Sequence, residues 1–265
     1  MIILIPMGGK GSRFSDAGYL TNKACILTTD RHTKKKLPMI ICAMKDIPEI
    51  SDINNKIICV DRDFHKINGT EDIILQYFPN TIFIHDHVML DQAFGCFLAR
   101  EFLQSEDELF IGACDNGFIY DEQEFNKAKS EFDVLMISHT NDNNIAQNPN
   151  AHSWAKLKAN SKKLEFLSLK KTISENPMQD HATTGMFWFK HASNFLANLE
   201  KMIWNKDTLD GKYYVDKVLQ YCIDAKLKVG YFDVKYLCWG TPADYENYEN
   251  TIAYWQNFIK NENIQ

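Results

Sequence analysis

The sequence predicts a mixed α/β fold in which helices flank a mostly parallel sheet. Short apolar runs of strand length alternate with stretches whose apolar residues recur at helical spacing, which is the pattern of βαβ units. Glycine-rich or acidic residues follow several of these runs directly. In the second half, shorter strand-like runs are separated by turns and are more antiparallel in character. We therefore expect a Rossmann-like sheet with a smaller antiparallel region after it.

Each half of the chain has its own set of expected elements. In the first half, strands are expected at residues 1–6, 55–60, 81–85 and 108–114, and helices at 72–78 and 93–103. In the second half, strands are expected at 133–138, 153–158, 164–169, 185–189 and 229–236, and helices at 192–204, 213–225 and 243–259. No internal repeat or low-complexity linker divides the chain, so we expect one domain over residues 1–265.

Composition and charge exclude several classes of protein. The 265 residues are 45% hydrophobic, which is enough for a packed core. The net charge is -6, from 29 basic and 35 acidic residues, so a nucleic-acid binder is not expected. The seven cysteines form no C-x-x-C pair, and several lie in apolar runs, as free thiols of a reducing compartment do. No apolar run reaches membrane-spanning length, and we expect a soluble, cytoplasmic protein without a membrane partner.

The first expected strand ends in a glycine-rich loop with basic residues. Glycine has no Cβ, so a phosphate can approach the bare N–H groups of such a loop closely. Arg13 and Lys23 add two positive charges to the same connection. The loop therefore predicts a site for a polyanion, and the alternative is a glycine-rich turn with incidental basic residues. We expect Met7, Gly8, Gly9, Gly11 and Ser12 to contact this polyanion.

The spacing in this loop resembles the signature of one enzyme family. A P-loop needs a glycine where this chain has Leu4, and the dinucleotide fingerprint needs one where it has Phe14. The pattern G-x-G-x-R, followed by a Gly-Tyr pair and then Lys23, resembles the nucleoside-diphosphate-sugar pyrophosphorylases, also called sugar-phosphate nucleotidyltransferases. That family usually has proline before the lysine, where this chain has Asn22. The resemblance implies that the polyanion is a nucleotide and that the loop residues Met7, Gly8, Gly9, Gly11 and Ser12 bind it.

The resemblance continues in the segments expected to bind the base and the acceptor. Gln92 lies where many relatives contact the nucleobase, although Asp91 replaces their glycine. Lys171 and Gly185 correspond to residues that bind the acceptor phosphate and sugar, although Lys170 replaces a glutamate that is usual there. The simpler interpretations are an ordinary helix residue for Gln92 and a solvated turn for the lysine pair.

Asp115 is the expected metal ligand. An acidic residue just past a strand of a parallel sheet suits a hard cation such as Mg²⁺, and the alternative is a turn cap. The resemblance implies that the metal lies here and bridges the nucleotide phosphates. The second metal carboxylate of the family corresponds to Cys238, which is a departure, and Asp233 or Asp244 remains open as its substitute.

Two histidines near the third expected strand are interpreted as ordinary surface or satisfied residues. His85 and His87 flank Asp86 and would face one side of an extended chain. A zinc site needs further ligands, and no Cys/His spacing supplies them.

Together, these matches imply a nucleotidyltransferase with the fold of the nucleotide-diphospho-sugar transferases. Residues 1–140 would bind the nucleoside triphosphate, and residues 141–265 would bind a phosphorylated small-molecule acceptor and close with a helix. Arg13 and Lys23 are the expected catalytic residues, with Mg²⁺ as cofactor. The product would be a nucleoside-diphosphate sugar, and the resemblance implies a role in surface polysaccharide biosynthesis. Two alternatives are a cytidylyltransferase for a phosphorylated alcohol or phosphonate, and a non-catalytic nucleotide-binding regulatory domain. The base, the acceptor and any homo-oligomer are left open.

Overall fold

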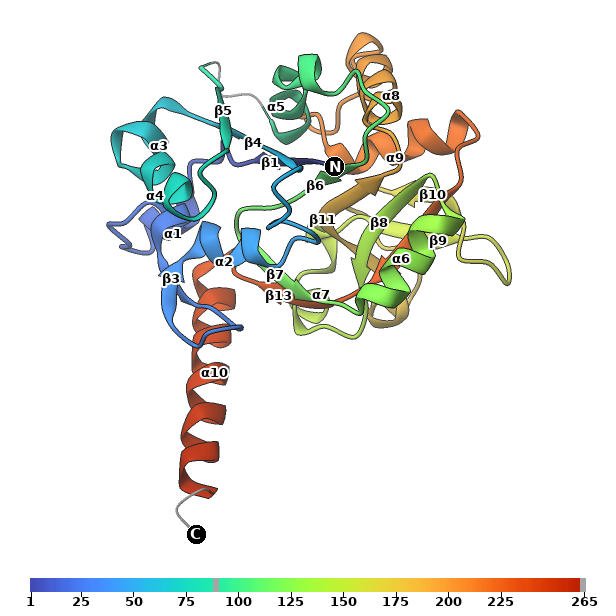
Figure 1. Ribbon diagram of the computed structural model, residues 1–265. Helices are drawn as coiled ribbons and strands as arrows, with labels where there is room; N and C mark the ends of the chain where they lie inside the picture. Colours follow the sequence, from blue (N-terminus) through green and yellow to red (C-terminus); the bar gives the residue numbers. More distant parts are fainter. Residues whose placement is uncertain (88–90, 263–265) are drawn as a thin grey trace.

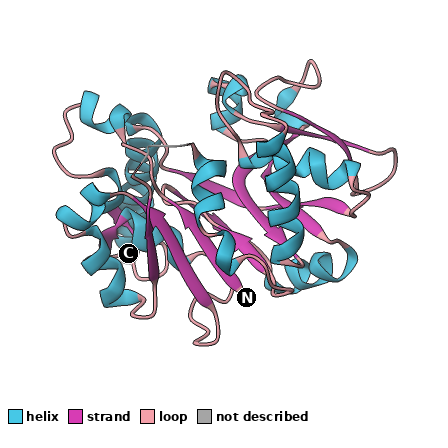
Figure 2. Cartoon of the chain, turned by 90° about the horizontal axis from the view of Figure 1, so that it is seen from above, coloured by secondary structure: helices cyan, strands magenta, loops and turns pink. Residues whose placement is uncertain are grey.

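The computed structural model describes residues 1–87 and 91–262, and in it a central sheet lies between layers of helices (Figure 1, Figure 2). The strands of this sheet are β1 (Ile2–Pro6), β4 (Lys56–Asp61), β5 (Ile82–His85), β6 (Leu109–Ile111), β8 (Val134–His139), β9 (Trp154–Leu157), β10 (Leu164–Ser168), β11 (His181–Phe189) and β12 (Val229–Asp233). Seven of them follow the order β10-β9-β11-β6-β1-β4-β5, and β8 pairs with β11 and β12.

The sheet is parallel in its first half and mostly antiparallel in its second. Strand β1 lies between β4 and β6 and runs parallel to both, and β5 extends this set beyond β4. Strand β11 is antiparallel to β6, β8 and β9, so it joins the two halves into one continuous sheet. The predicted fold class is thereby confirmed. The prediction of a single domain agrees with this continuity and stays a prediction.

Helices cover both faces of the sheet, which explains why its strands read as continuous apolar runs. Ile2 and Leu4 of β1 pack into one core, while Ile3 and Ile5 pack into the other. The first core lies under α5 (Gln92–Leu98), α8 (Ala192–Trp204) and α9 (Val215–Asp224). The second lies under α2 (Met39–Lys45), α4 (Thr70–Tyr77) and α6 (Glu122–Glu131).

Smaller elements complete the edge at which the parallel strands end. They are α1 (Ser12–Asp16), α3 (Asp63–Ile67), α7 (Asn143–Gln147), a hairpin of β2 (Leu27–Thr29) and β3 (Lys36–Pro38), and a two-stranded sheet of β7 (Asn116–Ile119) and β13 (Lys235–Cys238). Single 3-10 turns lie at Lys23–Cys25, Arg100–Phe102, Pro149–Ala151 and Pro177–Gln179. The last helix, α10 (Pro242–Glu262), runs from this edge away from the body of the molecule (Figure 1).

Several elements differ from the sequence-based expectations. The strand expected at 229–236 is two strands, β12 and β13, because the chain changes sheets between them. The helix expected at 93–103 ends at Leu98 and continues as a 3-10 turn. Helix α6 was not expected, because Phe125 is its buried contact with the core and most of its other residues are exposed. No helix in residues 1–87 and 91–262 is long and apolar enough to cross a membrane.

Candidate functional site

The glycine loop connects β1 to α1 at the carboxyl edge of the sheet. Met7 is buried, and its N–H donates to the carbonyl of Val60 at 2.8 Å, which fixes the loop to β4. Gly11 has a φ of +69°, and a Cβ on it would lie 2.9 Å from the Cβ of Lys23. A Cβ on Gly9, in contrast, would have no described heavy atom within 4 Å. The loop therefore requires glycine at position 11 and leaves the backbone of Gly9 open.

A depression of about 260 Å³ lies over this loop, and most of the predicted nucleotide-binding residues line it. Those in its wall are Met7, Gly9, Gly11, Ser12, Arg13, Lys23 and Asp115. Gly8 lies behind the loop, where a Cβ would be 3.7 Å from the side chain of Arg62. The structure thus brings together the loop and the two charged residues that the sequence associates with it.

Lys23 and Asp115 form an ion pair across the depression. The Nζ atom of Lys23 lies 2.5 Å from Oδ2 of Asp115 and 3.0 Å from the carbonyl oxygen of Gly240. It also lies 5.1 Å above the centre of the Phe14 ring, a cation–π contact. The Lys23 side chain is 13% exposed and that of Asp115 is 29% exposed. Two residues predicted to act on the phosphates are therefore each other's partners in the ligand-free structure.

A second, wider depression of about 560 Å³ adjoins the first and shares Arg13, Asp115 and Gly240 with it. Its wall is polar and includes the predicted residues Gln92 and Gly185.

Asp91, which stands where the family resemblance leads us to expect glycine, has a structural role in front of Gln92. It is the N-cap of α5, with Oδ1 accepting from the N–H of Phe94 at 3.1 Å. Its other oxygen accepts from the N–H of Tyr213 at 2.7 Å. The aspartate therefore holds the start of α5 and places Gln92 in the wall of the wider depression.

The lysine pair after β10 is placed differently from the expectation. Lys170 lines the wider depression, whereas Lys171 is exposed and lies outside its wall. Lys170 has a φ of +52°, and this left-handed turn separates the directions of the two side chains. The Lys170 Nζ atom donates to the carbonyl of Ala151 and lies 5.5 Å above the Tyr214 ring. The sequence could not show which lysine faces the cleft, because that depends on the conformation of the turn after β10.

Of the three carboxylates considered as metal ligands, Asp115 and Asp244 line the cleft, whereas Asp244 and Asp233 also have other partners. Asp115 lies at the junction of the two depressions. Asp244 accepts from Oγ1 of Thr241 at 2.6 Å and from Nδ2 of Asn144 at 2.6 Å, as a capping residue of α10. Asp233 accepts from Ser138 and pairs with His181, and it lines a different depression.

Cys238 is the residue at which the sequence resemblance predicts a second metal carboxylate. It lies opposite Asn116 in the β13–β7 pair, and its thiol contacts Asp244 at 3.6 Å. Burial, followed by the nearby Asp244 carboxylate, raises the pKa of Cys238 to about 12. The residue is thus a neutral thiol, which is a poor ligand for Mg²⁺. The donor set here fits a Mg²⁺ ion that is held by one carboxylate, Asp115, and by substrate phosphates, which is a common arrangement for this metal.

Two histidines line the cleft without a sequence signal that could have found them. His65 of α3 lies in the wall of the smaller depression, and its Nδ1 accepts from the N–H of Arg62 at 3.2 Å. Burial, together with the charge of Arg62, lowers the pKa of His65 to about 4. His152 lies in the wall of the wider depression, and burial and the neighbouring His139 lower its pKa to about 4 as well. Both are neutral at pH 7 and supply hydrogen-bonding groups rather than charge.

Comparisons with known proteins give matches in structure but none in sequence. No family model matches the chain, and no curated protein matches its sequence. A nucleoside-diphosphate-sugar pyrophosphorylase from Vibrio cholerae RC9 superposes with a TM-score of 0.72 at 17% identity, over 93% of this chain and 98% of that one. A putative glucose-1-phosphate thymidylyltransferase from Bacillus anthracis gives 0.69 at 17% identity, over 95% of each chain. The inositol-1-phosphate CTP transferase from T. maritima gives 0.64 at 16% identity, over 94% of this chain and 93% of that one. The resemblance suggested by the motifs is therefore confirmed at the level of the fold, which this chain shares with nucleotidyltransferases over nearly its whole length.

Proposed function

We propose that this chain is a nucleotidyltransferase that joins a nucleoside triphosphate to a phosphorylated small-molecule acceptor. An oxygen of the acceptor phosphate attacks the α-phosphorus of the triphosphate and forms a new P–O bond. The bond from the α-phosphorus to the bridging oxygen breaks, and pyrophosphate leaves. The products are an activated nucleoside-diphosphate compound and pyrophosphate.

The observation that carries this proposal is the meeting of the two depressions at Arg13, Asp115 and Gly240. One depression has an open glycine backbone and basic side chains, which suit a triphosphate. The other is larger and lined by amide, hydroxyl and charged side chains, with Gln92 for the nucleobase and the wall at Gly185 and Lys170 for a polar acceptor. Two substrates bound in them would place their phosphates at the shared wall, where the reaction requires them.

The residues of the cleft would act by alignment and charge compensation, which dominate catalysis of phosphoryl-type transfer. The open N–H groups of the glycine loop and Arg13 would hold the β- and γ-phosphates and the departing pyrophosphate. Lys23 would leave Asp115 and balance the negative charge that grows at the α-phosphate. Asp115 would hold a Mg²⁺ ion, which supplies positive charge to the phosphates when it is bound.

A sugar phosphate is the first candidate for the acceptor, and the product would then serve surface polysaccharide biosynthesis. A phosphorylated alcohol or a phosphonate, with CTP as donor, is the second. Lys170 favours this second class, because it lines the acceptor side of the cleft where relatives carry a glutamate for a sugar hydroxyl. A lysine there adds positive charge, which suits an acceptor with a second anionic group better than a neutral sugar ring.

The proposal is tested by a screen that crosses the four ribonucleoside triphosphates and dTTP with sugar phosphates, alcohol phosphates and phosphonates. Release of pyrophosphate is measured with Mg²⁺ present, and Lys23→Ala serves as the inactive control. We expect release that depends on one triphosphate and one acceptor class together. Nucleotide binding without pyrophosphate release for every acceptor would contradict the proposal and favour a non-catalytic regulatory domain, for which the missing carboxylate at Cys238 is the supporting observation.

A further inference from the structure

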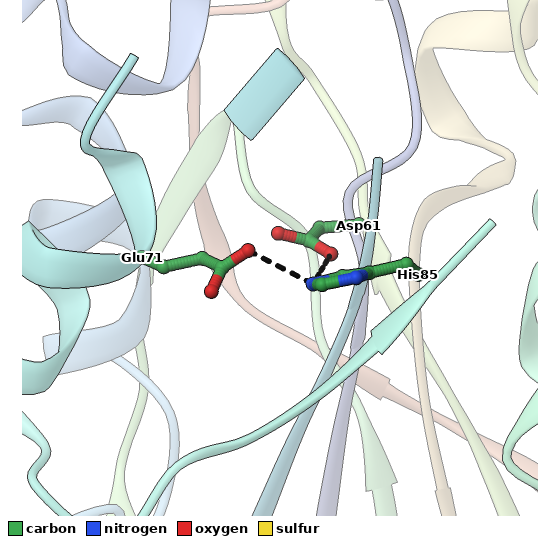
Figure 3. A group of neighbouring side chains, drawn as sticks. All are labelled: Asp61, Glu71 and His85. Carbon is green, nitrogen blue, oxygen red and sulfur yellow. Dashed lines mark hydrogen bonds and ion pairs between the residues drawn. The ribbon is translucent and has the colours of Figure 1, made fainter. Parts of the chain in front are cut away.

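A second cluster of metal-ligating side chains lies beside the cleft but outside both of its depressions. It consists of Asp61 at the end of β4, His85 at the end of β5 and Glu71 in the first turn of α4. Figure 3 shows the two carboxylates and the imidazole pointing toward one another from these three elements. None of the three lines either depression described above, so the cluster is distinct from the candidate active site.

The donor atoms are close enough to share one ion. One atom from each residue lies within 4.8 Å of the other two. The Nε2 atom of His85 is 2.9 Å from Oε1 of Glu71 and 3.6 Å from Oδ1 of Asp61. The first distance is a hydrogen bond, whereas the second is longer than one. An imidazole Nε2 carries at most one proton, so a hydrogen bond to Glu71 leaves Asp61 without that donor.

Asp61 is the member of the cluster that lacks compensation. Its side chain has an exposed fraction of 0%, and neither carboxylate oxygen has a hydrogen-bond partner among residues 1–87 and 91–262. A buried carboxylate without such partners is costly, and native structures place charged partners or metal ions beside it. The carboxylate of Asp61 therefore has no hydrogen-bond donor among the described residues at the point toward which the three side chains converge.

We propose that Asp61, Glu71 and His85 bind a divalent transition-metal ion, with Zn²⁺ as the best fit. One imidazole nitrogen and two carboxylate oxygens are a donor set that suits Zn²⁺, with a water molecule completing four-coordination. Mg²⁺ is a poorer fit, because it prefers oxygen ligands in an octahedral arrangement and retains several waters.

The proposed ion would stiffen the support of the glycine loop. The carbonyl of Asp61 accepts from the N–H of Asp86 at 2.7 Å, and a Cβ on Gly8 would lie 3.8 Å from Oδ2 of Asp86. A metal ion would tie α4 to the ends of β4 and β5 directly behind that loop. This role is structural and does not depend on the function proposed for the cleft.

The test uses the full-length, tag-free chain after removal of metals, titrated with Zn²⁺ against a chromophoric chelator. We expect one Zn²⁺ per wild-type chain and affinity at least about tenfold lower in His85→Ala and Glu71→Gln, since each variant removes a ligand. The matched control is His87→Ala, which lies near the same strand end and removes an exposed histidine paired with Asp63 at 3.1 Å. It should bind Zn²⁺ as the wild type does. Equal affinity in all variants, or an equal loss in the control, would overturn the assignment.

A second measurement begins with the wild-type chain, so its first result does not depend on how a variant folds. Co²⁺ added to the wild-type chain should give the visible absorption of a four-coordinate site, and Zn²⁺ should abolish it. The same spectrum is expected from Asp115→Asn, which removes the carboxylate of the cleft but none of the three ligands. A wild-type chain without stoichiometric Zn²⁺ or a Co²⁺ band would show that the proposal is wrong and that a proton, rather than a metal ion, balances Asp61. If the Co²⁺ band were lost only in Asp115→Asn, the ion would be bound in the cleft, and the proposed site at Asp61, Glu71 and His85 would be refuted as well.

Discussion

Replacing Gly11 by alanine tests whether the glycine loop needs its left-handed backbone and its close approach to Lys23. The residue has a φ of +69°, and a side chain in this left-handed region costs about 1–2 kcal/mol. The new Cβ would also lie 2.9 Å from the Cβ of Lys23, which is an atom near the backbone rather than the end of a flexible chain. The loop or the lysine must therefore move. We expect the free energy of unfolding to fall by ~2 kcal/mol, which lowers the Tm by ~4–8 °C in a chain of this size.

Two other glycines supply matched controls for this substitution. Gly18 also has a positive φ, +88°, but a Cβ there meets no described heavy atom within 4 Å. Gly18→Ala should therefore cost about 1 kcal/mol through the backbone alone and leave nucleotide binding unchanged. Gly9→Ala should change stability by less than about 0.5 kcal/mol. Its methyl group would nevertheless stand where a phosphate approaches the loop, so nucleotide affinity should fall at least about tenfold, or about 1.4 kcal/mol.

The assay combines urea unfolding with calorimetric binding of the triphosphate that the pyrophosphate screen selects. Gly9→Ala is the decisive variant, because it is expected to fold normally and to lose only binding. Wild-type affinity in that variant would refute the role of the loop in phosphate binding. Wild-type stability in Gly11→Ala would refute the inferred contact with Lys23.

Four further predictions concern the cleft. Lys23→Ala should lower turnover at least ~100-fold, as loss of one preorganised charge does, and near-normal pyrophosphate release would exclude Lys23 from the mechanism. Asp115→Asn should abolish Mg²⁺-dependent turnover, and unchanged metal dependence would disprove the ligand assignment. Lys170→Ala should raise the KM for the acceptor while Lys171→Ala does not, and the opposite result would restore the expectation from the sequence. Burial lowers the pKa of His65 to about 4, so the unfolded state takes up its proton first and stability falls as the pH drops from about 6.5 toward 4. The difference between the pKa of His65 in the unfolded state and in the folded state corresponds to at most roughly 3 kcal/mol of unfolding free energy. His65→Gln should remove that part of the pH dependence in urea unfolding.

The sequence predicts the parallel half of the fold well because its strands are buried on both faces. Residues 1–6 and 55–60 are continuous apolar runs, and they form β1 and β4 nearly as expected. Helix α6 escapes prediction because Phe125 is its buried residue and the rest of its pattern is polar. Elements that contribute little to the core leave little trace in apolar periodicity.

The site is predictable where it depends on one connected loop and less so where it depends on side-chain direction. Arg13, Lys23 and Asp115 meet as expected, since they follow strands that end at the same edge. The choice between Lys170 and Lys171 depends on the conformation of the turn after β10, which the sequence Lys-Lys does not encode visibly. The metal-ligating cluster behind the glycine loop could not be predicted from the sequence for another reason. Its ligands, Asp61, Glu71 and His85, come from two strand ends and a helix, and their spacing matches no local metal motif.

The ion pair between Lys23 and Asp115 ties the catalytic and metal-binding proposals together. At 2.5 Å, the Lys23 ammonium compensates the charge of the Asp115 carboxylate, so a cation that binds Asp115 is repelled by the neighbouring lysine unless that lysine moves away. A Mg²⁺ ion alone would have to displace the lysine charge from Asp115, whereas a magnesium–triphosphate complex offers the carboxylate a cation and the lysine an anion at the same time. The single ion pair between Lys23 and Asp115 is then replaced by two pairs, one between Asp115 and Mg²⁺ and one between Lys23 and the triphosphate. The cleft is therefore expected to bind the metal and the nucleotide together more strongly than either one alone, because each supplies the charge that the other's ligand loses.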